Sequence, residues 1–411
     1  MRTALKALTL VVILGLAACT SHGSPGTSSP TPSQSSRTNQ SVAPTEIGAA
    51  TTSPTSSPTP NPNPGLVVTD ARLGRSGQAI VGLNGTVWLT TDAGTTWRAI
   101  NPPMNPTSGH SVVDSQGSTI VALTIEGATL ETTKLVYQWS KDAGKTWSRL
   151  NLTPPQSMAS GEIALSADGS SVAVVASRYD SKTRQSTSVI FVGPVGKDLV
   201  GQPAPLAVVP AWVGTHLVLA GRGSEKNQLF VSDDRGKTWT QTTAAALAAA
   251  STGYLGSSPP GIGTPVRVTG GAVVPVTTFI GQVPSLSLLT TTDGRTFKSI
   301  FSVLIGQAGG GGEGALGSNA GPGGAVFVDF GSPRLFSVSG STVTKVETTG
   351  LPLQSTPAAI TFSDATHGLA LVNLSDCVTR SDGTSECGSS HNLYGTSDGG
   401  HTWVAATRPS A

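Results

Sequence analysis

Five aspartates recur along the chain in nearly the same setting. The shared pattern is Ser/Thr-x-Asp-x-Gly-x-Thr-Trp; four copies match it closely, and a fifth, which ends in Phe297, is one residue shorter. A carboxylate could serve as a general acid, a base or a nucleophile, but the neighbouring residue types favour a turn. The Asp can accept hydrogen bonds from the turn backbone, the Gly can adopt a left-handed conformation, and the Trp can pack its apolar face under the turn. We therefore predict a structural role for Asp92, Asp142, Asp234, Asp293 and Asp398.

Two other segments match patterns of catalytic or nucleotide-binding proteins. Gly395-Thr-Ser-Asp-Gly399 fits the Gly-x-Ser-x-Gly nucleophile elbow, but that elbow needs a strand leading into a helix, and this segment lies inside the last aspartate pattern. Gly309 to Gly314 fits Gly-x-Gly-x-x-Gly, but no helical pattern follows it. The histidines are scattered singly, without metal-ligand spacing. The sequence therefore indicates no catalytic residue, no metal site and no cofactor.

The N-terminal residues have the features of an export signal. A short charged start precedes an apolar run from Leu8 to Leu16, which is too short for a stable transmembrane helix, and Leu16-Ala-Ala-Cys19 ends the segment. This ending resembles the lipobox of bacterial lipoproteins, and the resemblance implies that Cys19 is lipidated. We expect residues 1–19 to be the signal peptide, residues 20–65 to be a disordered Ser/Thr/Pro-rich linker, and the protein to be extracytoplasmic and anchored to the cell membrane.

The chain has two further cysteines, Cys377 and Cys387. Export would place them where disulfides persist, so we expect them to pair. We predict strands at Gly368–Asn373 and Asn392–Ser397, joined by a long polar loop, Ser375–His391. The disulfide would then close the neck of this exposed loop.

The spacing of the aspartates indicates a repeat. Successive ones lie 50, 92, 59 and 105 residues apart, so each long interval is about twice a short one. We infer that two units have lost the pattern, and Ser188–Gly193 and Pro333–Ser339 are candidate strands of these units. Seven units of about 49 residues would each hold four short strands and their turns. In the first unit we expect one of these strands at Ala79–Leu83.

The aspartate pattern resembles the Asp box, or bacterial neuraminidase repeat, which occurs in sialidases and in propellers similar to photosystem II assembly factors. The resemblance implies an all-β fold, a seven-bladed β-propeller with Asp-box turns, over residues 66–411. Sialidases have six blades and an arginine triad, one member of which lies in a Phe/Tyr-Arg-Ile-Pro motif. The early arginines of this chain, Arg72 and Arg75, lie in Ala-Arg-Leu-Gly-Arg-Ser-Gly instead. The shared motifs define a scaffold and identify no activity.

Composition restricts the class of partner. Charged residues make up 12% of the chain and the formal net charge is +2, which argues against the concentrated basic face of a nucleic-acid-binding protein. Long polar hairpins on a rigid scaffold are the expected place for recognition. The candidate binding residues in these hairpins are Arg178, Tyr179, Lys182, Arg184, Arg222 and Arg380.

Two functions remain open. The first is a monomeric cell-envelope lipoprotein whose propeller is a non-catalytic binding or assembly scaffold for a protein or carbohydrate partner. The alternative is a divergent sialidase-like exo-glycoside hydrolase. A hydrolase of that kind needs two or three arginines and a pair of carboxylates that converge at the centre of the ring, so the two functions predict different central residues.

Overall fold

The computed structural model describes residues 66–68, 73, 79–83, 86–100, 110–127, 133–180, 182–183, 185–206, 208–222, 227–242, 247, 261–263, 265–268, 270–280, 283–304, 316–320, 324–329, 334–352, 356–379 and 385–407. All of them belong to the unit Pro60–Ala411. The expected signal peptide, Cys19 and the linker over 20–65 lie outside the described residues. Among the residues described, no helix is both long and apolar enough to cross a membrane.

Antiparallel strands rich in β-branched residues form five separate sheets of three to five strands. The first three sheets are β2 (Ala79–Leu83), β3 (Thr86–Thr90) and β4 (Arg98–Ala99); β5 (His110–Gln116), β6 (Thr119–Glu126), β7 (Lys134–Ser140) and β8 (Ser148–Leu152); and β9 (Ser160–Leu165), β10 (Ser171–Asp180), β11 (Gln185–Pro194) and β12 (Val200–Pro203). The next two are β13 (Pro210–Val213), β14 (His216–Arg222), β15 (Asn227–Ser232) and β16 (Thr240–Thr242); and β17 (Gly261–Ile262), β18 (Val266–Val268), β19 (Gly271–Ile280), β20 (Val283–Thr291) and β21 (Lys298–Leu304).

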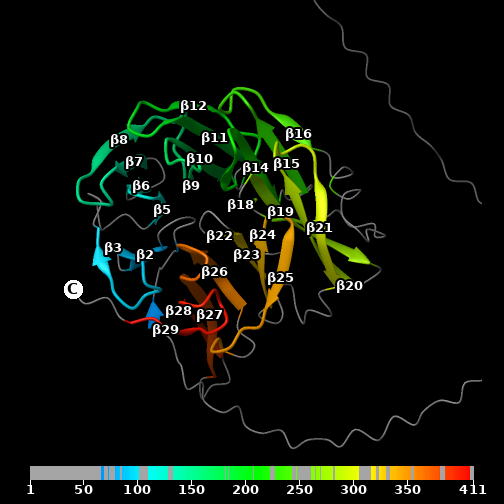
Figure 1. Ribbon diagram of the computed structural model, residues 1–411. Helices are drawn as coiled ribbons and strands as arrows, with labels where there is room; N and C mark the ends of the chain where they lie inside the picture. The colour runs from blue at the N-terminus through cyan, green and yellow to red at the C-terminus, as the bar shows by residue number, and fades with distance from the viewer. Residues whose placement is uncertain are drawn as a thin grey trace, which may run out of the picture. The chain divides into compact units, whose positions relative to one another are not determined.

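A sixth sheet has nine strands. Its members are β1 (Leu66–Val68), β22 (Leu316–Ala320), β23 (Gly324–Asp329), β24 (Arg334–Ser339), β25 (Thr342–Val346), β26 (Thr356–Phe362), β27 (Gly368–Thr379), β28 (Ser385–Thr396) and β29 (Val404–Ala405). The six sheets are arranged around a common centre, with β5 and β9 toward the centre and β8 and β12 at the periphery (Figure 1). The fold is an all-β propeller.

The predicted count of seven blades is wrong. Five sheets are separate, and the remaining strands form one nine-stranded sheet because β22 and β26 share a single parallel pair, Ala320 with Phe362. Of the two segments proposed as strands of units without an aspartate pattern, Ser188–Gly193 lies in β11, and residues 334–339 of the second form β24, while Pro333 lies outside the described residues. The turns after these two strands contain Gly196 and Gly340, both of which have a positive φ. Glycine adopts this left-handed conformation readily, so these turns form without the aspartate.

The hydrophobic core consists of clusters between neighbouring sheets. Leu123 of β6 and Leu165 of β9 belong to one cluster, and Val218 of β14 and Val274 of β19 belong to another. All four side chains are almost fully buried. Because each sheet is covered on two faces by its neighbours, its middle strands are apolar over most of their length.

The N-terminal strand joins the C-terminal sheet. β1 pairs antiparallel with β28, with Leu66 opposite Leu393. The segment after β29 contacts the first sheet, since the backbone N–H of Thr407 donates to the carbonyl of Gly94 (3.0 Å). Two sets of hydrogen bonds therefore close the ring between the start and the end of the described chain.

The segment Ser375–His391 is not the polar loop that we predicted. β27 continues to Thr379 and β28 begins at Ser385, so most of the segment is a two-stranded extension of the sheet. The predicted strand Ala79–Leu83 is confirmed as β2. The extension was missed because its Ser, Gly and Asp residues have low strand propensity, and the pairing of two such segments compensates for that.

Candidate functional site

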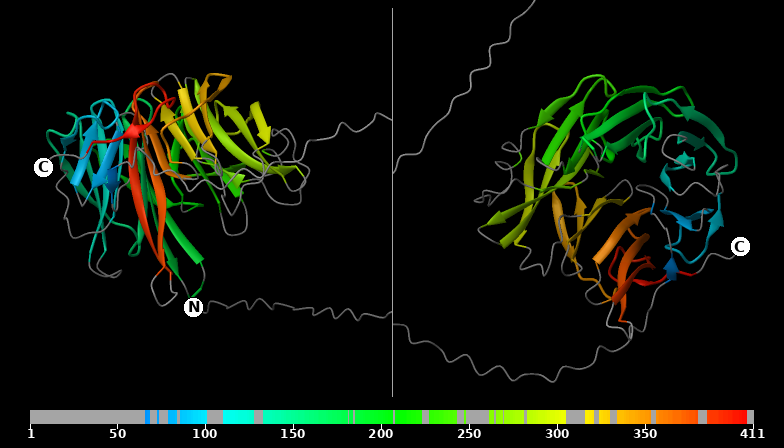
Figure 2. Two further views of the ribbon diagram at one scale, coloured as in Figure 1. Left: turned by 90° about the horizontal axis from the view of Figure 1, so that it is seen from below. Right: turned by 180° about the vertical axis from the view of Figure 1, so that it is seen from behind.

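The aspartate turns and the long hairpins lie at opposite ends of the same strands. β7, for example, begins at Lys134, after the hairpin from β6, and ends at Ser140, where an aspartate turn starts. We call the segments 90–97, 140–147, 232–239, 291–297 and 396–403 the box turns. Figure 2 (left) shows the ring from the side, with the red hairpin of β27 and β28 projecting at one face, where a green strand beside it reaches about as far. The box turns occupy one face and the hairpins the other.

Asp142 shows the hydrogen bonds of a box turn. Its Oδ1 accepts from Ser140 Oγ (2.7 Å) and from the Thr146 backbone N–H (2.9 Å), while its Oδ2 accepts from Thr146 Oγ1 (2.6 Å). Ser140 Oγ accepts in turn from the Gly144 N–H (2.7 Å). Asp92 and Asp234 repeat the same bonds, and Asp293 and Asp398 repeat most of them. Both carboxylate oxygens are thus engaged by the turn itself.

These bonds also set the acidity of the box aspartates. Hydrogen bonds from the Thr146 side chain and backbone hold the pKa of Asp142 well below its usual range. Equivalent bonds from Thr238 lower the pKa of Asp234 to about 2. A carboxylate so acidic remains ionised near neutral pH and is a poor general base.

Each box turn also touches the preceding sheet. Trp147 Nε1 donates to the carbonyl of Ile100 (2.8 Å), just after β4. Gly144 has φ +84°, and a Cβ built there would lie 2.8 Å from the Cβ of Ile100. The box turn therefore packs one sheet on the next, a role that its local sequence pattern does not reveal.

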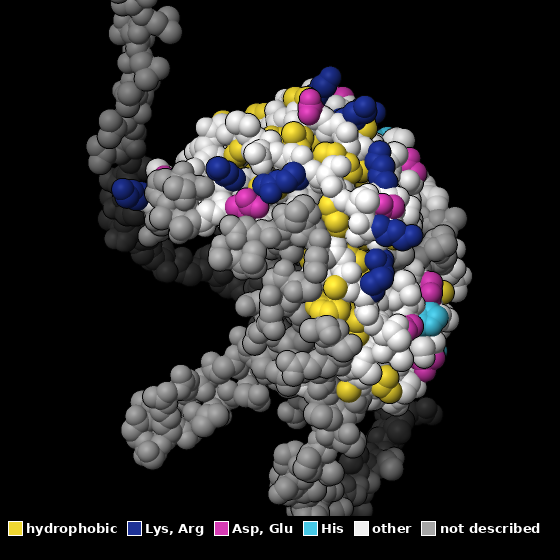
Figure 3. Space-filling model, turned by 90° about the vertical axis from the view of Figure 1, so that its left-hand side faces the viewer, with side chains coloured by type: hydrophobic (Ala, Val, Ile, Leu, Met, Phe, Trp, Pro, Cys, Tyr) yellow, Lys and Arg dark blue, Asp and Glu magenta, His cyan; other side chains and the backbone are white. Residues whose placement is uncertain are grey.

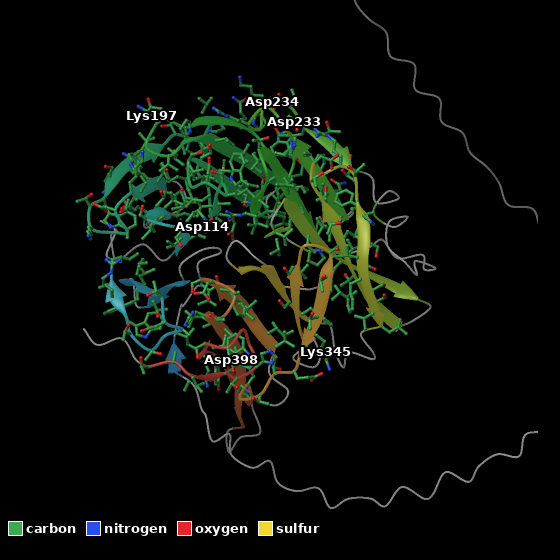
Figure 4. All side chains as sticks on the ribbon, viewed as in Figure 1. Asp114, Lys197, Asp233, Asp234, Lys345 and Asp398 are labelled. Carbon is green, nitrogen blue, oxygen red and sulfur yellow. The ribbon has the colours of Figure 1, made fainter. Side chains whose placement is uncertain are left out.

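A charged cluster lies near the centre of the ring. Asp114 of β5 is 2% exposed and is labelled near the centre of the ring in Figure 4. Its Oδ2 accepts from the Leu165 N–H of the next sheet (2.7 Å). From another side of the ring, Arg267 of β18 donates from Nη1 to Gln116 Oε1 (3.2 Å). Segments 151 residues apart thus meet here.

Asp168 belongs to the same cluster. It lies in the turn between β9 and β10, where Ser166 Oγ donates to Oδ1 (2.6 Å) and Ser170 Oγ donates to Oδ2 (2.7 Å). These bonds lower the pKa of Asp168 to about 2. Burial lowers the pKa of Arg267, and the negative charges of Asp114 and Asp168 oppose that shift. Among the described residues the cluster thus combines one arginine with two carboxylates, both already engaged by hydrogen bonds.

Sequence reasoning missed this cluster. The segment Ser166-Ala-Asp168-Gly-Ser170 contains the Ser-x-Asp of the box pattern but lacks its Thr-Trp, so it did not match the template. Arg267 stands between two valines that are almost fully buried in β18. The arginine between two valines was the feature of the sequence that could have indicated the cluster, because a charge within a short apolar strand needs a partner.

A second charged group links two sheets on the face of the box turns. His216 Nδ1 lies 2.6 Å from Asp233 Oδ1, and Arg295 Nη2 donates to Asp233 Oδ2 (2.7 Å). Hydrogen bonds from Arg295 and His216 lower the pKa of Asp233. The Asp233 side chain is 55% exposed, so solvent screens these pairs and they contribute little to stability.

The predicted binding residues lie at the hairpins, as far as they are described. Arg178 and Tyr179 are near the end of β10, where Tyr179 is 60% exposed, and Lys182 is exposed in the turn that follows. The structure gives only the backbone of Arg222, Cys377 and Cys387, in β14, β27 and β28. Arg184 and Arg380 lie outside the described residues.

Basic and acidic side chains are mixed on the side of the molecule that lies to the left in Figure 1. Figure 3 shows this side of the molecule, with Asp and Glu side chains between the Lys and Arg side chains. One pair is Arg149 with Glu126, whose charged atoms lie 3.6 Å apart. This view shows no uninterrupted basic surface among the residues described.

No protein-family model matches the sequence, and no curated protein matches it. Solved structures similar to it include an acylaminoacyl peptidase of Pyrococcus horikoshii, at a TM-score of 0.46 and 12% identity over 82% of this chain and 52% of that chain. The β-propeller domain of the Trilobed protease from Pyrococcus furiosus has a TM-score of 0.39 and 11% identity over 70% of this chain and 81% of that chain. A Trypanosoma rangeli sialidase has a TM-score of 0.37 and 12% identity over 68% of this chain and 53% of that chain. The chain spans about half the length of the peptidase and of the sialidase.

Proposed function

We propose that this chain is a cell-envelope lipoprotein whose propeller binds a protein or carbohydrate partner without catalysing a reaction on it. In this proposal Cys19 carries the lipid, residues 20–65 are the linker, and the partner contacts the hairpin face. The protein acts as a monomer and does not bind nucleic acid. The proposal combines the export signal in the sequence with the geometry of two hairpins, β10–β11 and β27–β28.

The hairpin of β10 and β11 carries the proposal. β9 pairs with β10 only as far as Ser177, so Arg178 to Asp180 pair only with β11. The tip therefore projects beyond the strands on either side of it. Tyr179 is 60% exposed there. An exposed aromatic with a hydroxyl group, flanked by cations on a rigid hairpin, is typical of a recognition site for a protein or a glycan.

The carboxylates of Asp114 and Asp168 already accept hydrogen bonds within the protein, which favours a binding function over hydrolysis. A sialidase-like enzyme needs a carboxylate that can exchange a proton, whereas Asp168 has a pKa of about 2 because Ser166 and Ser170 donate to it. One observation favours the alternative function, an exo-glycoside hydrolase. Arg267 lies close to Asp114 and Asp168 near the centre of the ring. Release of a fluorophore from sialoside or related glycosides by the purified chain would refute the non-catalytic proposal.

Site-specific photo-crosslinking tests the binding face. A photoreactive amino acid replaces Tyr179 in the full chain, expressed in cells that export and lipidate it, and a matched variant carries it at Lys145, which is exposed in a box turn. We expect a reproducible protein or glycan adduct from position 179 and none from position 145. Equal labelling at both positions would contradict a partner specific to the hairpin face.

Labelling with a fatty-acid analogue tests the anchor separately. The wild-type chain should incorporate the analogue and sediment with membranes, whereas Cys19→Ala should not, because a thiol is required for the lipid linkage. Incorporation into the Cys19→Ala variant would rule out this anchor and leave the binding proposal intact.

A further inference from the structure

We propose that Cys377 and Cys387 form a disulfide that stabilises the projecting end of the β27–β28 hairpin. We call this end, residues 374–379 paired with 385–390, the ribbon. The proposal deepens the proposed function, since the ribbon projects from the same face as Tyr179. The disulfide itself does not depend on what the protein binds.

The register of the two strands places the cysteines opposite each other. Cys377 is the direct partner of Cys387, between the pairs Asp376 with Gly388 and Val378 with Glu386. Directly opposed residues of antiparallel strands have Cα atoms about 4.5–5.5 Å apart. Disulfides require Cα atoms about 4.4–6.8 Å apart. A shift of one residue in the register would remove this match.

The ribbon has no third strand among the residues described. β26 pairs with β27 only as far as Asn373, which lies opposite Thr356, and β1 pairs with β28 only as far as His391, opposite Val68. Beyond these residues β27 and β28 pair only with each other. An isolated two-stranded ribbon is marginally stable in water, so a covalent link between its strands is physically useful where the sheet gives no support.

The position of the link differs from the one that we predicted from the sequence. It lies within paired strands, at Cys377 and Cys387, and not at the neck of a loop. There it fixes the strand register on both sides. It also restricts the unfolded chain by closing a short loop, which is the usual origin of disulfide stabilisation.

Formation of the bond needs an oxidant of the disulfide class, such as an exported thiol–disulfide oxidoreductase or a small-molecule disulfide. The thiolate of one cysteine attacks the oxidant and forms a mixed disulfide. The thiolate of the second cysteine then attacks the first sulfur and releases the reduced oxidant. In total the two cysteines lose two protons and two electrons, and the oxidant gains them as two thiols.

The test uses the full chain isolated from the exporting cells without reductant. Intact mass and thiol alkylation should show no reactive thiol at Cys377 or Cys387, and a non-reduced digest should contain the two peptides joined. Two free thiols, or a link from either cysteine to another molecule, would overturn the proposal. These readings are independent of any partner.

Hydrogen exchange tests what the bond does. On reduction, or in C377S/C387S, amide exchange in Leu374–Thr379 should accelerate at least about tenfold, because the ribbon then opens locally. Exchange in β6 and β7 should remain unchanged. The matched control replaces Ser375 and Ser389, another opposed pair of the ribbon, by alanine. Unchanged ribbon exchange on reduction would show that the bond does not stabilise the ribbon, even if photo-crosslinking at position 179 succeeds.

Discussion

The indole N–H of Trp97 donates a hydrogen bond to the backbone carbonyl of Thr407 (2.9 Å), 310 positions further along the chain. Trp147 makes the equivalent bond to Ile100 of the sheet before it. The first box turn therefore contacts the segment after β29, the last strand. In the same way, the second box turn contacts the first sheet. The same local motif packs neighbouring sheets and closes the ring.

Replacing Trp97 by phenylalanine should weaken the closure. Trp97→Phe keeps most of the apolar contact but removes the donor, so we expect the free energy of unfolding to fall by about 1 kcal/mol. Urea denaturation followed by tryptophan fluorescence measures this loss. Trp147→Phe is the matched variant and should lose a similar amount. A stable Trp97→Phe protein beside a destabilised Trp147→Phe protein would contradict the role of Trp97 in closure.

Box glycines should tolerate substitution less well than other turn glycines. Gly144→Ala combines a φ of +84° with a Cβ 2.8 Å from Ile100 Cβ, whereas Gly117→Ala has a φ of +58° and nothing within 4 Å. We expect about 1 kcal/mol of conformational cost at Gly117 and at least about 2–3 kcal/mol at Gly144. Thermal and urea unfolding can compare the two variants. Equal losses would show that the contact with Ile100 is unimportant.

Acid should unfold the protein through its turn aspartates. Asp234 and Asp168 have folded-state pKa values of about 2, below the ordinary value of 3.8, so folding favours their ionised forms. Their contribution is therefore complete above about pH 4 and is lost as the pH falls toward 2. The melting temperature should drop in this interval, and less steeply in Asp234→Asn. The exposed Asp198, which lies outside the box turns, provides the control variant Asp198→Asn.

Removing the central cation should destabilise the ring. Arg267→Met leaves Asp114, which is 2% exposed, without the positive charge that attracts it. We expect a loss of about 2 kcal/mol, below the usual figure for a fully buried pair because Arg267 is only partly buried. Arg149→Met removes an exposed partner of Glu126 and should cost less than about 1 kcal/mol. Similar unfolding curves for the two variants would contradict a structural role of the cluster.

The sequence predicted the local features of this fold more completely than the long-range ones. The hydrogen bonds of Asp142 involve only residues between Ser140 and Thr146, so a short pattern contains all the information needed. Tyr179 and Lys182 were placed on a hairpin for the same reason, because the strands around them are adjacent in the sequence.

The long-range features depend on pairings that no short pattern contains. Arg267 meets Gln116 only because β18 and β5 approach the same centre. The extent of β28 depends on its register with β27, and that register places Cys387 opposite Cys377. The merging of β22 with β26 through one residue pair, which altered the number of separate sheets, likewise arises from three-dimensional proximity.

The pairing of β1 with β28 has a consequence for the order of assembly. A ribosome makes Leu66 more than three hundred residues before it makes Leu393, its partner in the sheet. The first strand must therefore wait, unpaired, while the intervening sheets form, and contacts so distant in sequence make folding slow. Until the ring closes, β1 can pair with the wrong strands, and so can the uncovered edge of β28 once that strand has formed. The protein is then most vulnerable to aggregation just before the ring closes.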